Sequence, residues 1–379
     1  MPSFRRSVAD VPTSRTAAPP SRQVVTAPLV HQRPSVAPTV SVVILCYNYA
    51  HYLPASVGSA LTQAGVEIEV IIVDDTSTDD SLAVARRLAA ADPRVRVIAN
   101  ASNLGMVGTF NNGLAAATGE FVIRLDADDL LTPGSVARAT ALAEAFPEVG
   151  LVYGRPVHFA GSEPPTHRDT ARQWDLWSGS QWLELRCRRG VNCVTSPEVL
   201  MRKSVVDRVG PQRPLGHTPD MELWMRIARE SDIGWIGGAD QAWHREHDDS
   251  MSATGLDVMT DLHDRNEAFE VLLTDGHGDP RENSRLLMIA REALADEAIA
   301  RASAAYARGR GGGAETDGYV AFASSLGVDL DTLPHSASLR TAKRAGPSRA
   351  RFSPGLLARL VRDRLDRPRR RREWLDRGI

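Results

Sequence analysis

Short apolar runs recur along the first 150 residues of the chain. The run at residues 40–45 is rich in β-branched residues, which is typical of a strand buried on both faces of a parallel sheet. Four further runs predict strands at residues 69–73, 95–99, 121–125 and 150–153. Stretches with helical periodicity lie between them, at residues 53–63, 79–91, 106–117 and 134–145. Strands alternating with helices predict an α/β fold with a mostly parallel central sheet flanked by helices and joined by right-handed crossovers.

The regions outside this alternation have other patterns. The N-terminal segment is rich in Pro, Ser, Thr and Arg without a sustained period, which predicts disorder. Toward the C-terminus, helices are expected over residues 257–273, 283–308 and 318–326. We therefore divide the chain into a disordered leader (1–38), an α/β domain (39–255), a helical extension (256–330) and a basic tail (331–379) that is partly disordered or amphipathic.

Composition narrows the possible classes of protein. The chain has 379 residues, 42% of them hydrophobic, and a net charge of only -2, so we expect no nucleic-acid partner from overall charge. Three cysteines are too few for a disulfide framework, and they lack the second pair that a zinc site needs, so we expect a reducing, cytoplasmic location. No apolar stretch follows Arg5 and Arg6, and we expect neither a secretory signal nor a membrane-spanning segment.

Ligands bind at the carboxyl ends of the strands in open α/β sheets, so the polar residues that end each strand are the candidate site. The first strand ends in Cys46, Tyr47 and Asn48. A dinucleotide-binding fold needs Gly-x-Gly-x-x-Gly here, and a phosphate-binding loop needs glycine and lysine. Neither is present, which argues against a dehydrogenase and against a P-loop enzyme.

Acidic residues end the second and fourth strands. Asp74 and Asp75 can accept hydrogen bonds from a base or from ribose hydroxyls, although both can equally serve as turn and cap residues. Asp126, Asp128 and Asp129 place three carboxylates close together, and a divalent cation would relieve their repulsion. Hard oxygen ligands suit Mg²⁺ or Mn²⁺, although an isolated Asp-x-Asp is often a solvated turn.

Taken together, four segments resemble the family-2 glycosyltransferases of the GT-A fold. These are residues 39–48, 73–79, 103–113 and 125–129. The resemblance implies that Asp74 and Asp75 bind the nucleotide, with Tyr47 and Asn48 also at the donor site. It further implies that Asp126 lies on the donor diphosphate and that the Asp-x-Asp holds the metal. The sequence departs from the family at Thr76, where a small residue is usual, so the resemblance does not predict the geometry of that loop.

Two later segments extend the resemblance. Asp220, in residues 218–226, falls on the family's catalytic base, although Pro219 replaces the usual acidic neighbour. The alternative is that Pro219 and Asp220 only form the first turn of a helix reaching residue 228. Residues 243–252 resemble the family's Arg-x-His segment, in which Arg245 would pair with phosphate and His247 would donate to it or bind the metal. Ser250, Met251 and Ser252 follow as in relatives, and His244 is taken as structural.

The segment between these motifs carries weaker signals. Trp174, Trp177 and Trp182 could stack on a sugar, but the helical spacing of the first two favours a place in the core. Thr195 and Ser196 lie near the position where relatives approach the donor sugar.

The expected reaction is a single displacement that inverts the configuration at the anomeric carbon. Asp220 is the expected general base, and a hexosyl group is the group transferred. The expected donor is a nucleotide-diphosphate sugar, a UDP-sugar above all, and the acceptor is an unidentified hydroxyl. Two alternatives remain open at this point. One is a catalytically inactive sugar-nucleotide-binding or scaffold protein, and the other is a sugar nucleotidyltransferase.

The basic tail has its own pattern. Apolar residues cluster on one side of a helix expected over residues 354–365, arginines surround them, and Trp374 follows. A basic amphipathic helix can lie on an anionic membrane, which would place the protein on its cytoplasmic face beside a lipid-linked acceptor. The alternatives are a solvated tail, a helix packed on the α/β domain, or a nucleic-acid contact.

Overall fold

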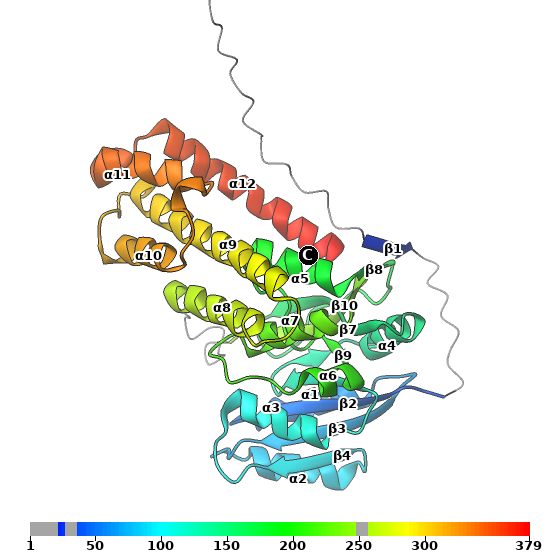
Figure 1. Cartoon of the computed structure of the whole chain (residues 1–379). Coiled ribbons are helices and arrows are strands. Elements are labelled where there is room, and N and C mark those ends of the chain that lie inside the picture. The colour runs from blue at the N-terminus through cyan, green and yellow to red at the C-terminus, as the bar shows by residue number, and fades with distance from the viewer. Residues whose placement is uncertain (1–21, 27–35, 248–256) are drawn as a thin grey trace, which may run out of the picture.

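All five predicted strands are present in the computed structural model, which describes residues 22–26, 36–247 and 257–379. They are β2 (Thr39–Cys46), β3 (Glu67–Asp74), β4 (Val95–Ala99), β5 (Phe121–Asp126) and β7 (Val149–Phe159). The predicted helices between them are α1 (Leu53–Leu61), α2 (Ser81–Ala91), α3 (Gly105–Ala116) and α4 (Ser135–Ala145). Figure 1 shows these elements as the lower, blue to green part of the molecule.

The sheet is larger and more mixed than the sequence pattern suggested. It also contains β1 (Arg22–Thr26), β6 (Leu130–Leu131), β8 (Gln173–Trp177), β9 (Leu200–Arg202) and β10 (Asp232–Arg245). The order is β1-β8-β10-β7-β9-β5-β2-β3-β4, with β6 on β10. The β5-β2-β3-β4 half is parallel as predicted, and β10 is parallel to β7. In contrast, β9, β8, β6 and β1 pair antiparallel with their neighbours.

Strand β1 corrects the prediction of a disordered leader. Residues 22–26 pair antiparallel with β8, with Arg22 opposite Trp177 and Thr26 opposite Gln173. Val25 packs against the core, whereas Val24 is exposed at the edge of the sheet. Two β-branched valines suit an edge strand, but their partner lies about 150 residues away and leaves no local signal.

The two faces of the sheet bury separate apolar clusters. Along β2, Val43 and Leu45 join one cluster, and Val42 and Ile44 join the other, as the two-residue period of a strand requires. Helix α3 lies very close to the first face, because a Cβ added to Gly113 would be 2.2 Å from Val43 Cγ1. A residue with no side chain is therefore needed at position 113.

The predicted core position of the three tryptophans is confirmed. Trp174, Trp177 and Trp182 are all buried. The first two lie on strand β8 rather than on a helix, and they contribute to opposite faces of the sheet. None of the three is available to stack on a sugar.

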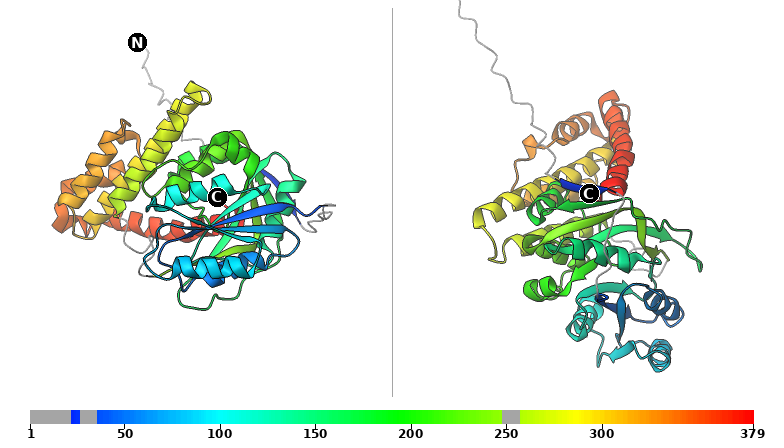
Figure 2. Two further views of the ribbon diagram at one scale, coloured as in Figure 1. Left: turned by 90° about the horizontal axis from the view of Figure 1, so that it is seen from below. Right: turned by 90° about the vertical axis from the view of Figure 1, so that its right-hand side faces the viewer.

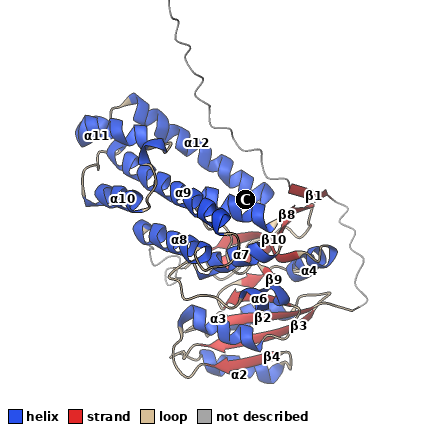
Figure 3. Cartoon of the chain, in the orientation of Figure 1, coloured by secondary structure: helices blue, strands red, loops and turns tan. Residues whose placement is uncertain are grey.

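Helices from the C-terminal half of the chain cover the part of the sheet that contains β7 and β10, and they continue beyond it (Figures 2 and 3). They are α5 (Gly179–Arg189), α6 (Lys203–Val209), α7 (Pro219–Glu230), α8 (Val258–Leu273), α9 (Pro280–Ala307), α10 (Ala314–Ser325), α11 (Ser336–Ala350) and α12 (Pro354–Arg377), with a short 3₁₀ turn at Leu330–Thr332. Long helix α9 packs against α5, α8, α10 and α11. Because residues of α8 and α9 belong to the same apolar cluster as β2 and α7, the extension shares one core with the sheet.

The basic tail ends against the sheet. Helix α12 runs well beyond the predicted residue 365, and Glu373 forms an ion pair with Arg189 of α5 (Nη2–Oε2, 3.0 Å). The Tyr153 hydroxyl of β7 donates a hydrogen bond to the Gly378 carbonyl, and Ile379 is buried. Of the alternatives for the tail, a helix packed on the α/β domain describes this end. Among the described helices, none is both long and apolar enough to cross a bilayer.

Candidate functional site

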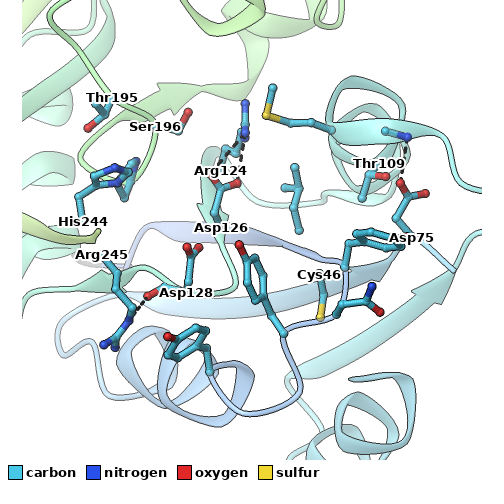
Figure 4. Close-up of a pocket in the computed structure, with 18 of the residues that line it drawn as sticks. Cys46, Asp75, Thr109, Arg124, Asp126, Asp128, Thr195, Ser196, His244 and Arg245 are labelled. Atoms are coloured by element: carbon cyan, nitrogen blue, oxygen red, sulfur yellow. Dashed lines mark hydrogen bonds and ion pairs between the residues drawn. The ribbon is translucent and has the colours of Figure 1, made fainter. Parts of the chain in front are cut away.

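A pocket of about 840 Å³ opens where β2, β3 and β5 end, as expected for an open α/β sheet (Figure 4). Most of the predicted site residues line it, namely Tyr47, Asn48, Asp75, Asp126, Asp128, Asp220, Arg245 and His247. Asp74 and Asp129 do not line it. Ser250, Met251 and Ser252 lie outside the described residues.

The loop after β2 is held by the loop after β3. Asn48 has a left-handed backbone (φ 60°), which asparagine tolerates better than most residues. Its Oδ1 accepts a hydrogen bond from the Thr78 N–H (2.7 Å), and its N–H donates to Ser77 Oγ (3.0 Å). The side-chain oxygen of Asn48 is therefore engaged in joining the two loops, while Tyr47 next to it is exposed at the pocket.

The two acids after β3 have different roles. Asp75 accepts hydrogen bonds from Leu104 N–H (2.8 Å) and Gly105 N–H (2.9 Å), at the start of α3. Asn100 Nδ2 also donates to it (2.8 Å), so this buried carboxylate fixes the pocket's right-hand wall in Figure 4. Asp74 accepts from Ser77 N–H (3.2 Å) and shapes the turn. Of the two acids predicted at the nucleotide, only Asp75 therefore lines the pocket, while Asp74 is engaged by the loop.

Thr76 has φ 59°, a left-handed conformation that is unusual for a β-branched residue. Such a backbone costs on the order of 1–3 kcal/mol unless the surroundings impose it. A β-branched residue at this position, where a small residue is usual, is therefore held in a strained backbone conformation. The Thr76 hydroxyl donates to the Asp75 carbonyl (2.6 Å), which offsets part of that cost.

The three acids after β5 each contact a different basic group. Arg124 Nη2 lies 3.2 Å from Asp126 Oδ1, and His247 Nε2 lies 2.9 Å from Asp128 Oδ2. Burial raises the pKa of Asp128, and the neighbouring charge of Asp126 raises it further. The charge of Asp126 therefore disfavours the charged form of Asp128 at the edge of the pocket.

Asp129 is directed away from the pocket. Its Oδ1 accepts from the Arg245 N–H (2.8 Å), and its Oδ2 lies 3.0 Å from His244 Nδ1. Burial raises the pKa of Asp129 to about 6, although its hydrogen bond to His244 opposes the rise. Both oxygens are used to hold the end of β10, and Asp129, an expected metal ligand, does not line the pocket.

The remaining acidic groups are suited to a cation without forming a complete site. Within residues 22–26, 36–247 and 257–379, no group of three or more His, Cys, Asp or Glu side chains is arranged to hold a metal. Asp126 and Asp128 nevertheless line the pocket together, and their mutual repulsion would be relieved by a cation. Two carboxylates are typical of Mg²⁺ or Mn²⁺ sites whose other ligands are water and substrate phosphates.

The end of β10 brings positive charge to the pocket. The Arg245 guanidinium stacks between the rings of Tyr52 (4.6 Å) and Phe159 (4.5 Å), and its Nε donates to the Asp128 carbonyl (3.0 Å). His244, which the sequence interpretation left as structural, also lines the pocket. Burial lowers the pKa of His244, but the hydrogen bond and charge of Asp129 outweigh it and raise the pKa to about 9.

Asp220 lies in the first turn of α7 and lines the pocket. Burial raises the pKa of its carboxyl, and the nearby charge of Arg124 partly opposes the rise. The Met221 N–H donates to its Oδ1 (2.7 Å). Deeper in α7, Arg226 Nε donates to buried Glu222 (2.9 Å), and Arg226 Nη2 donates to the Pro211 carbonyl (2.7 Å). These contacts fix the helix that carries Asp220.

A further wall was only weakly indicated by the sequence. Thr195 and Ser196 line the pocket, as Figure 4 shows, and buried Glu198 lies directly behind them. Glu198 accepts hydrogen bonds from the Thr195 N–H (2.7 Å) and the Thr195 hydroxyl. Burial raises the pKa of Glu198 to about 7. None of the motifs considered in the sequence includes Glu198, although its contacts lie within residues 195–198.

Comparisons with known proteins agree with this geometry. Residues 41–210 match the model of Glycosyl transferase family 2. An uncharacterized glycosyltransferase of Nostoc sp. is 43% identical over 152 residues, covering 38% of this chain and 47% of the relative. The succinoglycan biosynthesis protein ExoO of Rhizobium meliloti is 41% identical over 108 residues, covering 28% and 30%. The chain thus matches less than half the length of either relative.

Two solved structures share the fold. Residues 1–349 of S. aureus TarS, in complex with UDP-GlcNAc, have a TM-score of 0.53 at 17% identity, covering 76% of this chain and 91% of that one. The mannosyltransferase PcManGT of Pyrobaculum calidifontis, in complex with GDP-Man and Mn²⁺, has a TM-score of 0.50 at 20% identity, covering 82% and 87%. Residues 41–210 of this chain are thus similar to glycosyl transferase family 2, and the chain has the GT-A fold of these two solved structures.

Proposed function

We propose that this protein transfers a sugar from a nucleotide-diphosphate donor to a hydroxyl group of an acceptor, with inversion at the anomeric carbon. The observation that carries the proposal is that one pocket is lined by Asp220, by the paired acids Asp126 and Asp128, and by Arg245. A proton acceptor and groups suited to a diphosphate thus share one pocket, and a direct displacement needs both.

The donor in this proposal is a UDP-sugar. Two structural neighbours hold nucleotide sugars, UDP-GlcNAc in one and GDP-Man in the other, which supports the class of donor. Tyr47 is exposed at the pocket and offers a ring face to the base. Asp75 and Asn48 act indirectly, because their hydrogen bonds fix the backbone of the loops around the nucleotide.

The diphosphate end of the donor would lie near Asp126 and Asp128. These residues, with His247 on Asp128, are the groups that would hold Mn²⁺ or Mg²⁺. A bound cation supplies positive charge that neutralises the departing nucleotide diphosphate. Arg245 and His244 add fixed positive charge on the same side of the pocket. Asp129 holds the His244 ring and the Asp128 carbonyl holds the Arg245 guanidinium, so little rearrangement is needed when charge develops there.

Asp220 is the general base in this mechanism. As the acceptor oxygen bonds to the anomeric carbon, its proton passes to a carboxylate oxygen of Asp220, and the bond to the diphosphate breaks. Burial favours this role, because a raised pKa makes the carboxylate a better proton acceptor. Arg124 opposes part of that rise, which helps to keep Asp220 ionised before the reaction.

The proposal is tested with the purified full chain, Mn²⁺ and a panel of UDP- and GDP-sugars. Release of nucleoside diphosphate by transfer or slow hydrolysis is expected for at least one donor. Binding of a donor, measured by calorimetry, without any turnover across acceptors would support an inactive sugar-nucleotide-binding protein instead. In that case Pro219, which replaces the family's acidic residue, would be the first position to revert to an acid.

A further inference from the structure

Helix α12 has an inward and an outward face. Leu356 is buried against the protein, and the helix ends at buried Gly378. Leu357, Val361 and Leu365 are instead 42%, 58% and 68% exposed. Their four-residue spacing places them in one stripe along the helix, about 12 Å long at 1.5 Å per residue. The sequence pattern grouped Leu356 with this stripe, but the structure separates the two.

Positive charge lies along one flank of the stripe and at both of its ends. Arg362, Arg369 and Arg372 are exposed, and helical spacing places the first two along one flank and the third beyond the C-terminal end of the stripe. At the other end, Phe352 is 68% exposed, with the Arg351 guanidinium 4.6 Å from the centre of its ring. Residues 336–379 contain fourteen Lys and Arg but only four Asp and Glu, in a chain whose net charge is -2. Positive charge is therefore concentrated on α11 and α12, which make up most of these residues.

We propose that the outward face of α12 binds the surface of an anionic lipid bilayer, with the helix lying in the plane of the headgroups. In that position the apolar stripe contacts the acyl boundary, and the arginines contact lipid phosphates. The part of the molecule that is described offers no membrane-crossing helix, so this contact is peripheral.

Other occupants match the surface less well. A second copy of this chain on the same face would bring two arginine-rich helices together, which is unfavourable. A nucleic acid would pair with the arginines but would leave Leu357, Val361 and Leu365 without an apolar partner. An anionic bilayer provides both kinds of contact. The proposal is independent of sugar transfer, because no residue of α12 lines the pocket.

The test is co-sedimentation of the full chain with phosphatidylcholine vesicles, with or without about 30% phosphatidylglycerol, at about 0.1 M salt, where charge interactions extend about 10 Å. Binding should be at least about tenfold stronger on the anionic vesicles and should weaken as salt is raised. Leu357→Gln, Val361→Gln and Leu365→Gln combined should lower binding at least about tenfold, since each removes an inserted apolar side chain. Arg362→Gln or Arg369→Gln should lower it about fivefold each.

Matched controls separate these effects from folding. Met288 on α9 is also 42% exposed, so Met288→Gln should leave vesicle binding unchanged, as should Arg281→Gln at the start of α9. Thermal melting should be the same for every variant, because only exposed side chains are changed. Equal pelleting of the wild-type and triple-Gln proteins would overturn the proposal, as would equal pelleting on neutral and anionic vesicles. Tight binding to duplex DNA without binding to vesicles would assign the surface to nucleic acid and also overturn it.

Discussion

Replacing Glu198 by glutamine should change how the stability of this protein depends on pH. Glu198 is buried behind the pocket wall, and burial raises the pKa of its carboxyl from 4.5 to about 7. A carboxyl whose pKa is higher in the folded state keeps its proton while the unfolded chain loses it. Between these two pKa values the folded state therefore binds more protons, and stability falls as pH rises.

The size of the effect follows from the shift. A difference of about 2.5 pKa units corresponds to about 3 kcal/mol, at 1.36 kcal/mol per unit. The free energy of unfolding of the wild type, minus that of Glu198→Gln, should fall by up to about 3 kcal/mol from pH 4.5 to pH 7 and then level off. Glutamine retains an oxygen for the Thr195 N–H and a donor for the Thr195 hydroxyl, so the contacts persist without the titration.

The assay is urea unfolding of both proteins at half-unit steps from about pH 4.5 to 8, followed by tryptophan fluorescence. Taking the difference between the two proteins removes the contributions of all other titrating groups. Parallel curves across this range, or a difference that grows with pH, would refute the account of Glu198 as a buried carboxyl. Donor affinity measured on the same samples should vary less in the variant, because Glu198 holds the Thr195 wall of the pocket.

Three further changes have definite expected outcomes. Gly113→Ala should lower the free energy of unfolding by about 1–3 kcal/mol in urea titrations, because its Cβ would be 2.2 Å from Val43 Cγ1. The control is Gly318→Ala in α10, where an added Cβ would have no atom within 4 Å, and it should instead raise the free energy of unfolding by about 0.5–1 kcal/mol. Equal effects of the two substitutions on stability would contradict the close approach of α3. Excess chelator should abolish transfer and Mn²⁺ should restore it, whereas full activity in chelator would remove the metal from the mechanism. Asp128→Asn should weaken Mn²⁺-dependent donor binding by at least about tenfold in calorimetry, and an unchanged affinity would assign Asp128 to the His247 contact alone.

The first half of the fold could be predicted because its signals are local. The runs that became β2, β3 and β5 are short, apolar and β-branched, and each leads directly to the polar residues of the pocket. Parallel strands bring their carboxyl ends to one edge of the sheet. The motifs at Asp75 and Asp126, which end strands on either side of β2, are therefore expected at the same edge. Asp220 could be assigned only through the family resemblance, since its own segment also fits a helix start.

The rest depended on pairings between distant segments. Strand β1 required β8 as a partner, and its two valines alone are too short a signal to indicate that pairing. The antiparallel pairing of β6 with β10 brings Asp129 beside His244, a contact that the sequence did not indicate. The docking of Gly378 on Tyr153 likewise arises from tertiary packing, which periodicity and motif spacing do not encode.

The central claim is that Asp220 accepts the proton in a sugar-transfer reaction, and Asp220→Asn tests it most directly. Asparagine keeps the shape of the side chain but cannot take the proton. Turnover of the best donor should fall by at least about 10²-fold, while calorimetric donor affinity changes by less than about twofold. Asp317→Asn, which alters another acid in the first turn of a helix, α10, and lies outside the pocket, should leave both unchanged. Near-normal turnover in a folded Asp220→Asn protein would contradict the account and leave Asp220 as a helix-capping residue.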